Sequence, residues 1–296
     1  MSIEHTIDLG GNEQYGLKLL GFLGGIIVLA ITCFLDDMKG IPPFTKLAGQ
    51  LIAAIIVVYS GVRIENLNLP FFNQIGLNDA ASIILTLGWI IGITNAINLI
   101  DGLDGLSSGI CIISSVSLLI IFALNYSPMI AIILITALAG ALVGFIPFNF
   151  NPAKTFIGDT GSNFLGFSLS VISILGVAKT YTAVVIVAPL IVLALPVFDT
   201  ICAIIRRIVK GKSIKAVMQA DKGHLHHRLM QKGYTQKQSV FILYGISATF
   251  GIFAVILLDS GIWKALSFAL MVIAVVAIGY KNIFKIKQLE SEKDER

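Results

Sequence analysis

The chain has 296 residues, of which 56% are hydrophobic and 13% are charged, and its mean hydropathy is +0.90. This composition excludes a separate water-soluble domain and predicts an all-α, polytopic membrane protein embedded in a lipid bilayer. The formal charge of +4 is small, and we expect no nucleic-acid partner.

Nine apolar runs of roughly 16–24 residues are candidates for membrane spans. The run 46–61 is short, and the run 182–205 contains Pro189 and Pro196. We predict a single transmembrane domain over residues 1–296, formed by a bundle of about nine helices. The predicted spans are 17–35, 46–61, 81–100, 106–124, 128–146, 161–177, 182–205, 239–258 and 262–280.

Lysine and arginine are unevenly distributed between the segments that join these spans. The loops 36–46, 147–160 and 204–238, together with the tail 281–296, hold 17 of the 21 basic residues. Short cytoplasmic loops of membrane proteins carry an excess of Lys and Arg. We therefore expect these loops and the C-terminus in the cytoplasm, and the N-terminus outside.

The polar start of the chain and its cysteines are assigned no catalytic role. Residues 1–16 lack a positively charged region before an apolar one, so we expect no signal peptide. The cysteines Cys33, Cys111 and Cys202 lie in apolar runs without metal-ligand spacing. We interpret them as packing residues.

The first polar loop begins with two adjacent carboxylates, Asp36 and Asp37, at the end of a predicted span. Negative charge is unfavourable at a helix C-terminus because of the helix macrodipole. A metal ion or a nearby lysine would offset this effect. The alternative is an ordinary solvated pair at the membrane interface.

The second polar loop, Asn95 to Gly105, lies between two long apolar runs. Asn95, Asn98, Asp101 and Asp104 are spaced three residues apart, so on a helix they fall along one face. A carboxylate at the bilayer centre costs about 2.5–3.5 kcal/mol, and two neighbouring carboxylates repel unless a cation separates them. The pattern predicts a hard-cation or phosphate site at the mouth of the bundle. A plain polar loop is the alternative.

The third loop, 148–163, contains a proline and two glycines that suit a backbone in close contact with a ligand. Lys154 can supply a point charge to a phosphate, and Phe156 a flat surface for a base. Asp159 stands directly before the next span. The alternative is a turn-rich linker in which Asp159 or Ser162 caps a helix.

The fourth loop, 206–238, is basic and holds three of the four histidines of the chain. The cluster His224, His226 and His227 beside Arg228 suits a polyanion such as a diphosphate. A zinc site is a weaker interpretation, because no Cys or Glu accompanies the histidines in this loop. A basic surface that touches anionic lipid head groups is the third possibility.

One aspartate, Asp199, lies inside the span 182–205 near its cytoplasmic end. We interpret it as a structural residue that pairs with a basic neighbour or supports the site. The charge distribution places the acidic loops and the histidine cluster on the same side of the membrane. This arrangement favours one shared site.

These motifs resemble those of the polyprenyl-phosphate N-acetylhexosamine-1-phosphate transferases, which form glycosyltransferase family 4. The resemblance is greatest to the bacterial undecaprenyl-phosphate N-acetylglucosamine-1-phosphate transferases. It extends from residue 36 to 228 with the motifs in the family's order. The matching stretches are Asp36-Asp37 with Lys46, Asn95 to Gly105, Phe148 to Phe150 with Pro152 to Lys154, Phe156 to Gly161, and His224 to Arg228.

The resemblance implies a role for each matching residue. Asn98, Asp101 and Asp159 would lie at a Mg²⁺ ion, with Mn²⁺ as a possible substitute. The catalytic carboxylates would be Asp36, Asp37, Asp101 and Asp159. Uracil would contact Asp104 and Phe156, the lipid phosphate Lys46, and the sugar-nucleotide diphosphate the histidine motif. The implied substrate-binding residues are Lys46, Asp104, Asn149, Lys154, Phe156, His224, His226, His227 and Arg228.

The implied reaction transfers N-acetylglucosamine-1-phosphate from UDP-GlcNAc to undecaprenyl phosphate and releases UMP. It would be the first membrane step of a cell-envelope polysaccharide of the teichoic acid or O-antigen type. The resemblance also implies a bacterial plasma-membrane location and a homodimer. Family members carry ten to eleven spans, so two N-terminal spans are expected to be missing here.

Several alternatives stay open. The same chemistry on another UDP-HexNAc is one, and a shortened, inactive homologue that acts as a membrane scaffold is another. A transporter would place its carboxylates at midspan and carry an inverted repeat, neither of which is evident. A CDP-alcohol phosphotransferase would carry Ala-Arg after its first Asp-Gly, which the stretch from Asp101 to Leu106 lacks.

Overall fold

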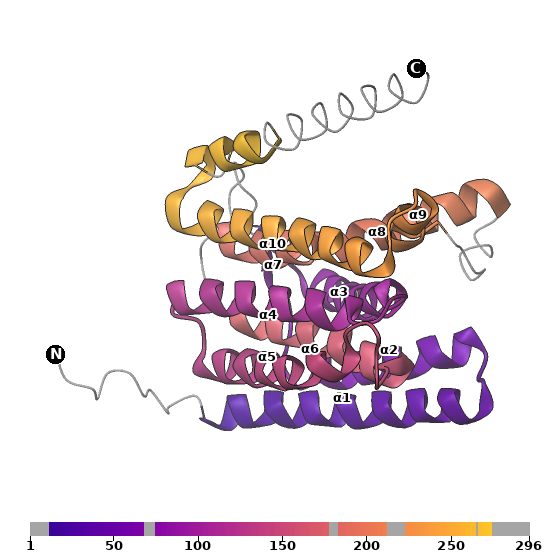
Figure 1. The fold of residues 1–296 in the computed structure, drawn as a ribbon. Helices are drawn as coiled ribbons and strands as arrows, with labels where there is room; N and C mark the ends of the chain where they lie inside the picture. The colour runs from indigo at the N-terminus through magenta and orange to yellow at the C-terminus, as the bar shows by residue number, and fades with distance from the viewer. Residues whose placement is uncertain (1–11, 68–74, 178–182, 212–222, 265, 274–296) are drawn as a thin grey trace, which may run out of the picture.

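The computed structural model describes residues 12–67, 75–177, 183–211, 223–264 and 266–273 (Figure 1). Long helices lie side by side in a bundle, and one pair of two-residue strands joins antiparallel with Asn66 opposite Gly76. In chain order the elements are α1 (Asn12–Lys39), α2 (Pro43–Tyr59), β1 (Asn66–Leu67), β2 (Ile75–Gly76), α3 (Asp79–Ile100), α4 (Leu106–Leu124), α5 (Met129–Asn149), α6 (Gly158–Val177), α7 (Ala183–Val192), α8 (Ala194–Gly211), α9 (Leu225–Gln231) and α10 (Gln236–Ser260).

Six helices in the described part of the chain are long and apolar enough to cross a membrane: α1, α3, α4, α5, α6 and α10. The all-α, polytopic class predicted from the sequence is confirmed. The predicted span 46–61 falls on α2, which has only 17 residues. The predicted span 262–280 extends beyond the described residues.

The predicted span 182–205 is divided between two consecutive helices, α7 and α8, and is not one continuous helix. Pro196 has no backbone N–H to donate to Val192, and its ring would clash with that carbonyl. The first helix accordingly ends at Val192, and the second begins at Ala194.

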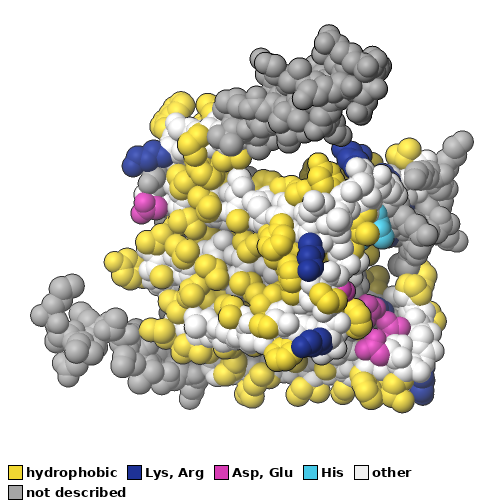
Figure 2. All heavy atoms as spheres, viewed as in Figure 1, with side chains coloured by type: hydrophobic (Ala, Val, Ile, Leu, Met, Phe, Trp, Pro, Cys, Tyr) yellow, Lys and Arg dark blue, Asp and Glu magenta, His cyan; other side chains and the backbone are white. Residues whose placement is uncertain are grey.

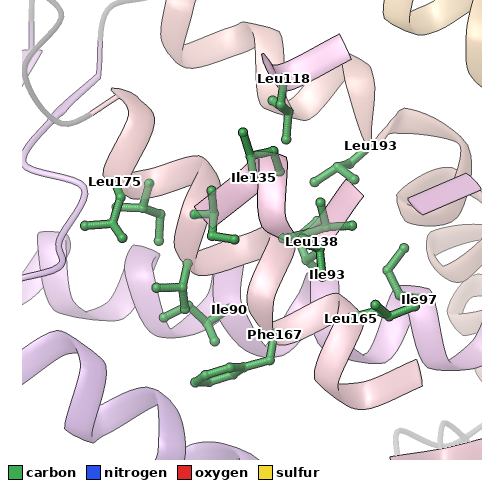
Figure 3. Packing of buried hydrophobic residues seen from close by; sticks show 14 of the residues in the cluster. Ile90, Ile93, Ile97, Leu118, Ile135, Leu138, Leu165, Phe167, Leu175 and Leu193 are labelled. Carbon is green, nitrogen blue, oxygen red and sulfur yellow. The ribbon is translucent and has the colours of Figure 1, made fainter. Parts of the chain in front are cut away.

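Helices α3 and α6 form the centre of the bundle. They cross so closely that a Cβ on Gly166 would lie 2.7 Å from the Cα of Thr94. Small residues at such crossings allow close backbone approach, as is usual for membrane helices. Around the crossing, Ile93, Leu165 and Phe167 pack into a buried apolar core (Figure 3).

Apolar side chains also cover the outside of the bundle (Figure 2). Along α1, Leu20, Ile27 and Phe34 are all more than half exposed. Such a surface is unstable in water and suits hydrocarbon. The polar segments are the exception, and they meet where α1, α3 and α5 end.

Candidate active site

The polar residues predicted to form a site gather at one end of the bundle. Figure 2 shows a group of acidic side chains there, on the side of the molecule where α9 lies in Figure 1. The junctions α1–α2, α3–α4 and α5–α6 all lie at this end, because α1, α3 and α5 each run towards it. The shared site that the charge distribution favoured is thus present as a spatial cluster.

Lys46 joins the first and third of these junctions. Its ammonium contacts a carboxylate oxygen of Asp159 and lies 3.4 Å from Asp36 Oδ2. Asp36 lies in the last turn of α1, so the lysine offsets the unfavourable charge at that helix end. The neighbouring Asp37 faces the same segment, since it accepts a 2.7 Å hydrogen bond from Thr160 Oγ1.

Asn98 contacts Asp159 from the other side. Its Nδ2 donates to Asp159 Oδ1 at 3.3 Å and to Ser162 Oγ at 2.9 Å. Both partners lie in the first turn and a half of α6, which begins at Gly158. The last turn of α3 and the first turn of α6 are therefore fixed to each other beside the Lys46 ammonium.

A buried amide network lies beneath these contacts. Gln50 of α2, only 2% exposed, donates to Asn163 Oδ1 at 2.8 Å. The Gln50 amide oxygen also accepts from Asn95 Nδ2 at 2.7 Å. Asn163 in turn donates to the carbonyl of Asp159 at 2.7 Å. The network holds three helices together directly below the carboxylates.

The expectation that Asn95, Asn98, Asp101 and Asp104 share one helix face is wrong for the aspartates. Helix α3 ends at Ile100, Asp101 is its C-cap residue, and the chain then turns towards α4. Asp101 lies at the centre of a tight turn, since the Gly102 N–H donates to the Ile100 carbonyl at 2.8 Å, and Gly105 adopts a φ of 76° that a helix does not allow.

Asp101 is turned away from Asn98 and accepts a 2.6 Å hydrogen bond from Ser107 Oγ. The pKa of the Asp101 carboxyl is raised to about 6, chiefly by burial and in smaller part by the negative charge of Asp159, while the Ser107 hydrogen bond acts in the opposite direction. The negative charge of Asp159 thus affects the pKa of Asp101, although the two side chains have different hydrogen-bond partners.

Asp104 fixes the third loop. One of its carboxylate oxygens accepts from Asn151 Nδ2 at 2.9 Å and from the Ala153 N–H at 3.2 Å. Asn149 lies beneath the same loop, 3% exposed, bonded to Ser108 Oγ and the Thr155 carbonyl. The structure therefore gives Asn149 a supporting position under the loop, and its contact with substrate stays a prediction.

The two loop residues predicted to contact a nucleotide lie on the surface. Phe156 is 73% exposed, and the Lys154 side chain is also exposed. The loop backbone is fixed behind them, since the Lys154 and Thr155 N–H groups both donate to the Phe148 carbonyl. Both side chains are accessible to a ligand, and their roles stay predictions.

The histidine motif is partly helical, so the prediction of a loop over 206–238 is wrong in part. Helix α8 extends to Gly211, and α9 covers Leu225–Gln231. His224 is the N-cap residue of α9, and His226 is 2% exposed. The intervening stretch 212–222 lies outside the described residues.

His226 places the histidine motif in contact with the second polar loop. A Cβ on Gly102 would lie 2.2 Å from His226 Nε2, so the imidazole rests directly on the glycine backbone. The pKa of His226 is lowered to about 4, chiefly by burial and in smaller part by the neighbouring His227 and His224. Neither ring nitrogen has a protein hydrogen-bond partner among the described residues. His227 packs against the ring of His226, and Arg228 is exposed.

A divalent cation would take its protein ligands from the described residues of this site. They contain no group of three or more His, Cys, Asp or Glu side chains with metal-site geometry. Mg²⁺ nevertheless requires only one or two protein carboxylates, because waters and substrate phosphates complete its shell. Asp159 offers a carboxylate oxygen and the neighbouring Asn98 an amide oxygen, although the Asn98 atom that contacts Asp159 in this structure is the amide nitrogen. The Lys46 ammonium already places a positive charge beside Asp159.

Several residues of the site were not predicted from the sequence. Gln50, Asn163, Ser107 and Thr160 were missed, although a lone glutamine in an apolar run is a signal that could have identified Gln50. Asp199 was interpreted as structural, and the structure pairs it with His224 Nδ1 at 2.9 Å.

The fold and the site define an integral membrane enzyme whose polar centre lies at one end of a helix bundle. A family model described as glycosyl transferase family 4 matches residues 19–177. The chain belongs to this family.

Comparison with individual proteins gives the same family. The chain is 39% identical to the probable undecaprenyl-phosphate N-acetylglucosaminyl 1-phosphate transferase of Bacillus subtilis, over 91% of this chain and 73% of the relative. It is 34% identical to the decaprenyl-phosphate N-acetylglucosaminephosphotransferase of Mycolicibacterium smegmatis, over 88% and 68%. It is 37% identical to the phospho-N-acetylmuramoyl-pentapeptide-transferase of Streptococcus thermophilus, over 55% and 50%.

Proposed function

We propose that this chain transfers N-acetylglucosamine-1-phosphate from UDP-GlcNAc to undecaprenyl phosphate and releases UMP. The names of the Bacillus and Mycolicibacterium relatives support a polyprenyl phosphate as acceptor and an N-acetylglucosamine phosphate as the transferred group. The product would start a cell-envelope polysaccharide of the teichoic acid or O-antigen type.

One observation carries the proposal: the Lys46 ammonium lies between Asp36 and Asp159, which come from different helices. Both substrates are anionic phosphates, so transfer between them depends on positioning and on charge neutralisation. Lys46 and the two carboxylates lie where the ends of three helices meet. Together they provide both cationic and anionic groups. An inert scaffold has no need to gather such charges at the end of a membrane helix bundle.

In the proposed reaction an oxygen of the lipid phosphate bonds to the phosphorus that carries the sugar, and the bond from that phosphorus to UMP breaks. Lys46 would bind the lipid phosphate, and the second loop with α9 would hold the diphosphate. A phosphate monoester has a second pKa of about 6, so it is largely ionised at neutral pH without a strong base. Asp36 and Asp37 would position it or accept its last proton.

Asn98 and Asp159 would hold the divalent cation, with Asp101 nearby. Bound Mg²⁺, or Mn²⁺ in its place, would neutralise the diphosphate and align it for in-line displacement. Asp104 and Phe156 are assigned to the uracil. We place the site in the cytoplasm, where the nucleotide sugar is made, and we expect a homodimer from the resemblance alone.

The test is transfer of label from UDP-[¹⁴C]GlcNAc into butanol-extractable lipid by membranes that contain the protein, with and without Mg²⁺. We expect Mg²⁺-dependent label with the wild type and none with Asp159→Asn. Asp79→Asn is the matched control, because Asp79 is exposed in the first turn of α3, at the opposite end of that helix. Equal label in Asp159→Asn would refute the site, and no label in the wild type would refute UDP-GlcNAc as donor.

Direct displacement has its own test. An aspartyl-phosphate intermediate would release UMP before the lipid is bound. Exchange of labelled UMP into UDP-GlcNAc without any lipid phosphate would therefore contradict the direct route. We expect exchange only when undecaprenyl phosphate is present.

A further inference from the structure

Asp199 uses both of its carboxylate oxygens to hold the start of α9. Oδ2 lies 2.9 Å from His224 Nδ1, and Oδ1 accepts a 3.0 Å hydrogen bond from the Leu225 N–H. Asp199 is 2% exposed and His224 is 4% exposed. Burying a carboxylate costs free energy unless it is paired. The contacts with His224 and Leu225 provide this pairing for Asp199.

The pairing fixes which nitrogen of His224 carries a proton. An ionised carboxylate only accepts hydrogen bonds, so the short contact places the hydrogen on His224 Nδ1. The ring is then oriented with Nε2 as its remaining polar atom. In a ring that is protonated on both nitrogens, Nε2–H donates to an anionic oxygen of a ligand.

His224 is in turn in contact with the rest of the motif. Its ring stacks on that of His226, with centroids 5.9 Å apart and an interplanar angle of 8°. His226 rests on Gly102 in the second loop. Because α9 begins at Leu225, its N-terminus and both rings are fixed relative to Gly102 through Asp199 of α8.

We propose that Asp199 is a positioning residue for the nucleotide site: it fixes His224 with Nδ1 protonated and Nε2 directed to the diphosphate of the donor. This inference rests on the proposed function, because it takes a nucleoside diphosphate as the ligand of α9. Asp199 itself does not touch the ligand. Its effect passes through His224 and is confined to the donor substrate.

A double-mutant cycle on UDP binding tests this coupling. The purified wild type, Asp199→Asn, His224→Gln and the double variant are titrated with UDP by isothermal titration calorimetry, which needs no turnover. We expect each single variant to weaken binding about tenfold, the usual scale of one charge-assisted hydrogen bond. The double variant should bind no more weakly than His224→Gln alone. Effects that multiply to about a hundredfold, or no effect of Asp199→Asn, would overturn the inference.

Kinetics separate positioning from general damage. Asp199→Asn should raise the KM for UDP-GlcNAc and leave the KM for undecaprenyl phosphate unchanged, whereas a disturbed bundle would change both. Ser173→Ala is the control for a lost buried hydrogen bond, since Ser173 bonds Trp89 in the core of the bundle. It should change neither KM.

The tautomer of His224 is read by NMR in the wild-type protein, and a variant is needed only to assign the signal. In protein labelled with ¹⁵N-histidine, the His224 signal is assigned by its loss in His224→Gln. We expect Nδ1 protonated, and a neutral Nε2–H tautomer would overturn the inference. A wild type that neither binds UDP nor transfers label would refute the proposed function as well. If the enzyme is active and binds UDP, but the double-mutant cycle shows no coupling or the wrong tautomer is found, only the role of Asp199 is refuted.

Discussion

The Lys46 ammonium contacts the Asp159 carboxylate although 113 residues separate them in the chain. This contact connects the start of α2 to the start of α6. The same ammonium lies 3.4 Å from Asp36 Oδ2 at the end of α1. Three helix ends thus meet around one positive charge. The carboxylates would repel one another without it, so the lysine holds the site together before any substrate arrives.

Replacing Lys46 with methionine should abolish most of the activity by loss of lipid-phosphate binding. Methionine preserves the apolar stem and removes only the charge. We expect kcat/KM for undecaprenyl phosphate to fall about 100-fold, the scale for removing one electrostatic contact to a reacting phosphate, while UDP binding is retained. Lys39→Met is the control, because Lys39 is exposed in the last turn of the neighbouring α1. Equal losses in the two variants would contradict a specific role for Lys46.

Replacing Gln50 with leucine should destabilise the protein and impair catalysis together. The substitution removes the bonds to Asn163 and Asn95 and leaves their polar atoms buried, which costs about 1–3 kcal/mol per unsatisfied group. We expect a lower midpoint in thermal unfolding of the detergent-solubilised enzyme. Thr136→Val should be nearly neutral, because Thr136 is exposed on α5 and bonds only within its own helix. An unchanged midpoint for Gln50→Leu would show that the network contributes little.

The sequence predicted the fold class and the meeting of the four polar segments, because both follow from properties that act along the whole chain. Apolar run length identifies helices such as α4 and α5, and basic loops place the polar segments on one side. The two-helix structure of α7 and α8 was not predicted, since a proline can kink a membrane helix or end it, depending on neighbours.

The details of the site depend on contacts between distant residues, which a single sequence does not reveal. The spacing of Asn98 and Asp101 suggested a common helix face, but α3 ends at Ile100, and Asp101 accepts a hydrogen bond from Ser107 instead. The partner of Asp199, His224, lies 25 residues further along the chain at the N-cap of a separate helix. Only the arrangement of α8 against α9 brings the two together.

Adding one methyl group to Gly102 should displace the histidine motif. The new Cβ would lie 2.2 Å from His226 Nε2, far inside contact distance, and the stacked neighbours leave that ring little room to move. We expect Gly102→Ala to weaken UDP binding at least tenfold and to leave the contacts of Lys46 with Asp36 and Asp159 unchanged. Gly88→Ala provides the comparison, because no atom lies within 4 Å of a Cβ at that position in α3. Wild-type UDP affinity in Gly102→Ala would mean that the loop and α9 do not act together.

Replacing His226 with leucine should stabilise the ligand-free protein in acid and weaken its binding of UDP. The pKa of His226 is lowered to about 4 from 6.5, chiefly by burial, so the unfolded chain takes up this proton at a higher pH than the folded chain does. Stability of the wild type should therefore fall as the pH is lowered from about 6.5 towards 4. Leucine cannot be protonated, so this part of the pH dependence should disappear, which thermal unfolding at pH 7.5 and pH 5 would measure.

At neutral pH, His226→Leu should be at least as stable as the wild type, since it removes two buried nitrogens that have no protein partner among the described residues. A ligand oxygen would supply that partner, and for this reason UDP should stabilise the wild type more than the variant. The same dependence on pH in both proteins would contradict the burial of a neutral imidazole at this position. Equal stabilisation of both by UDP would exclude His226 from the nucleotide site.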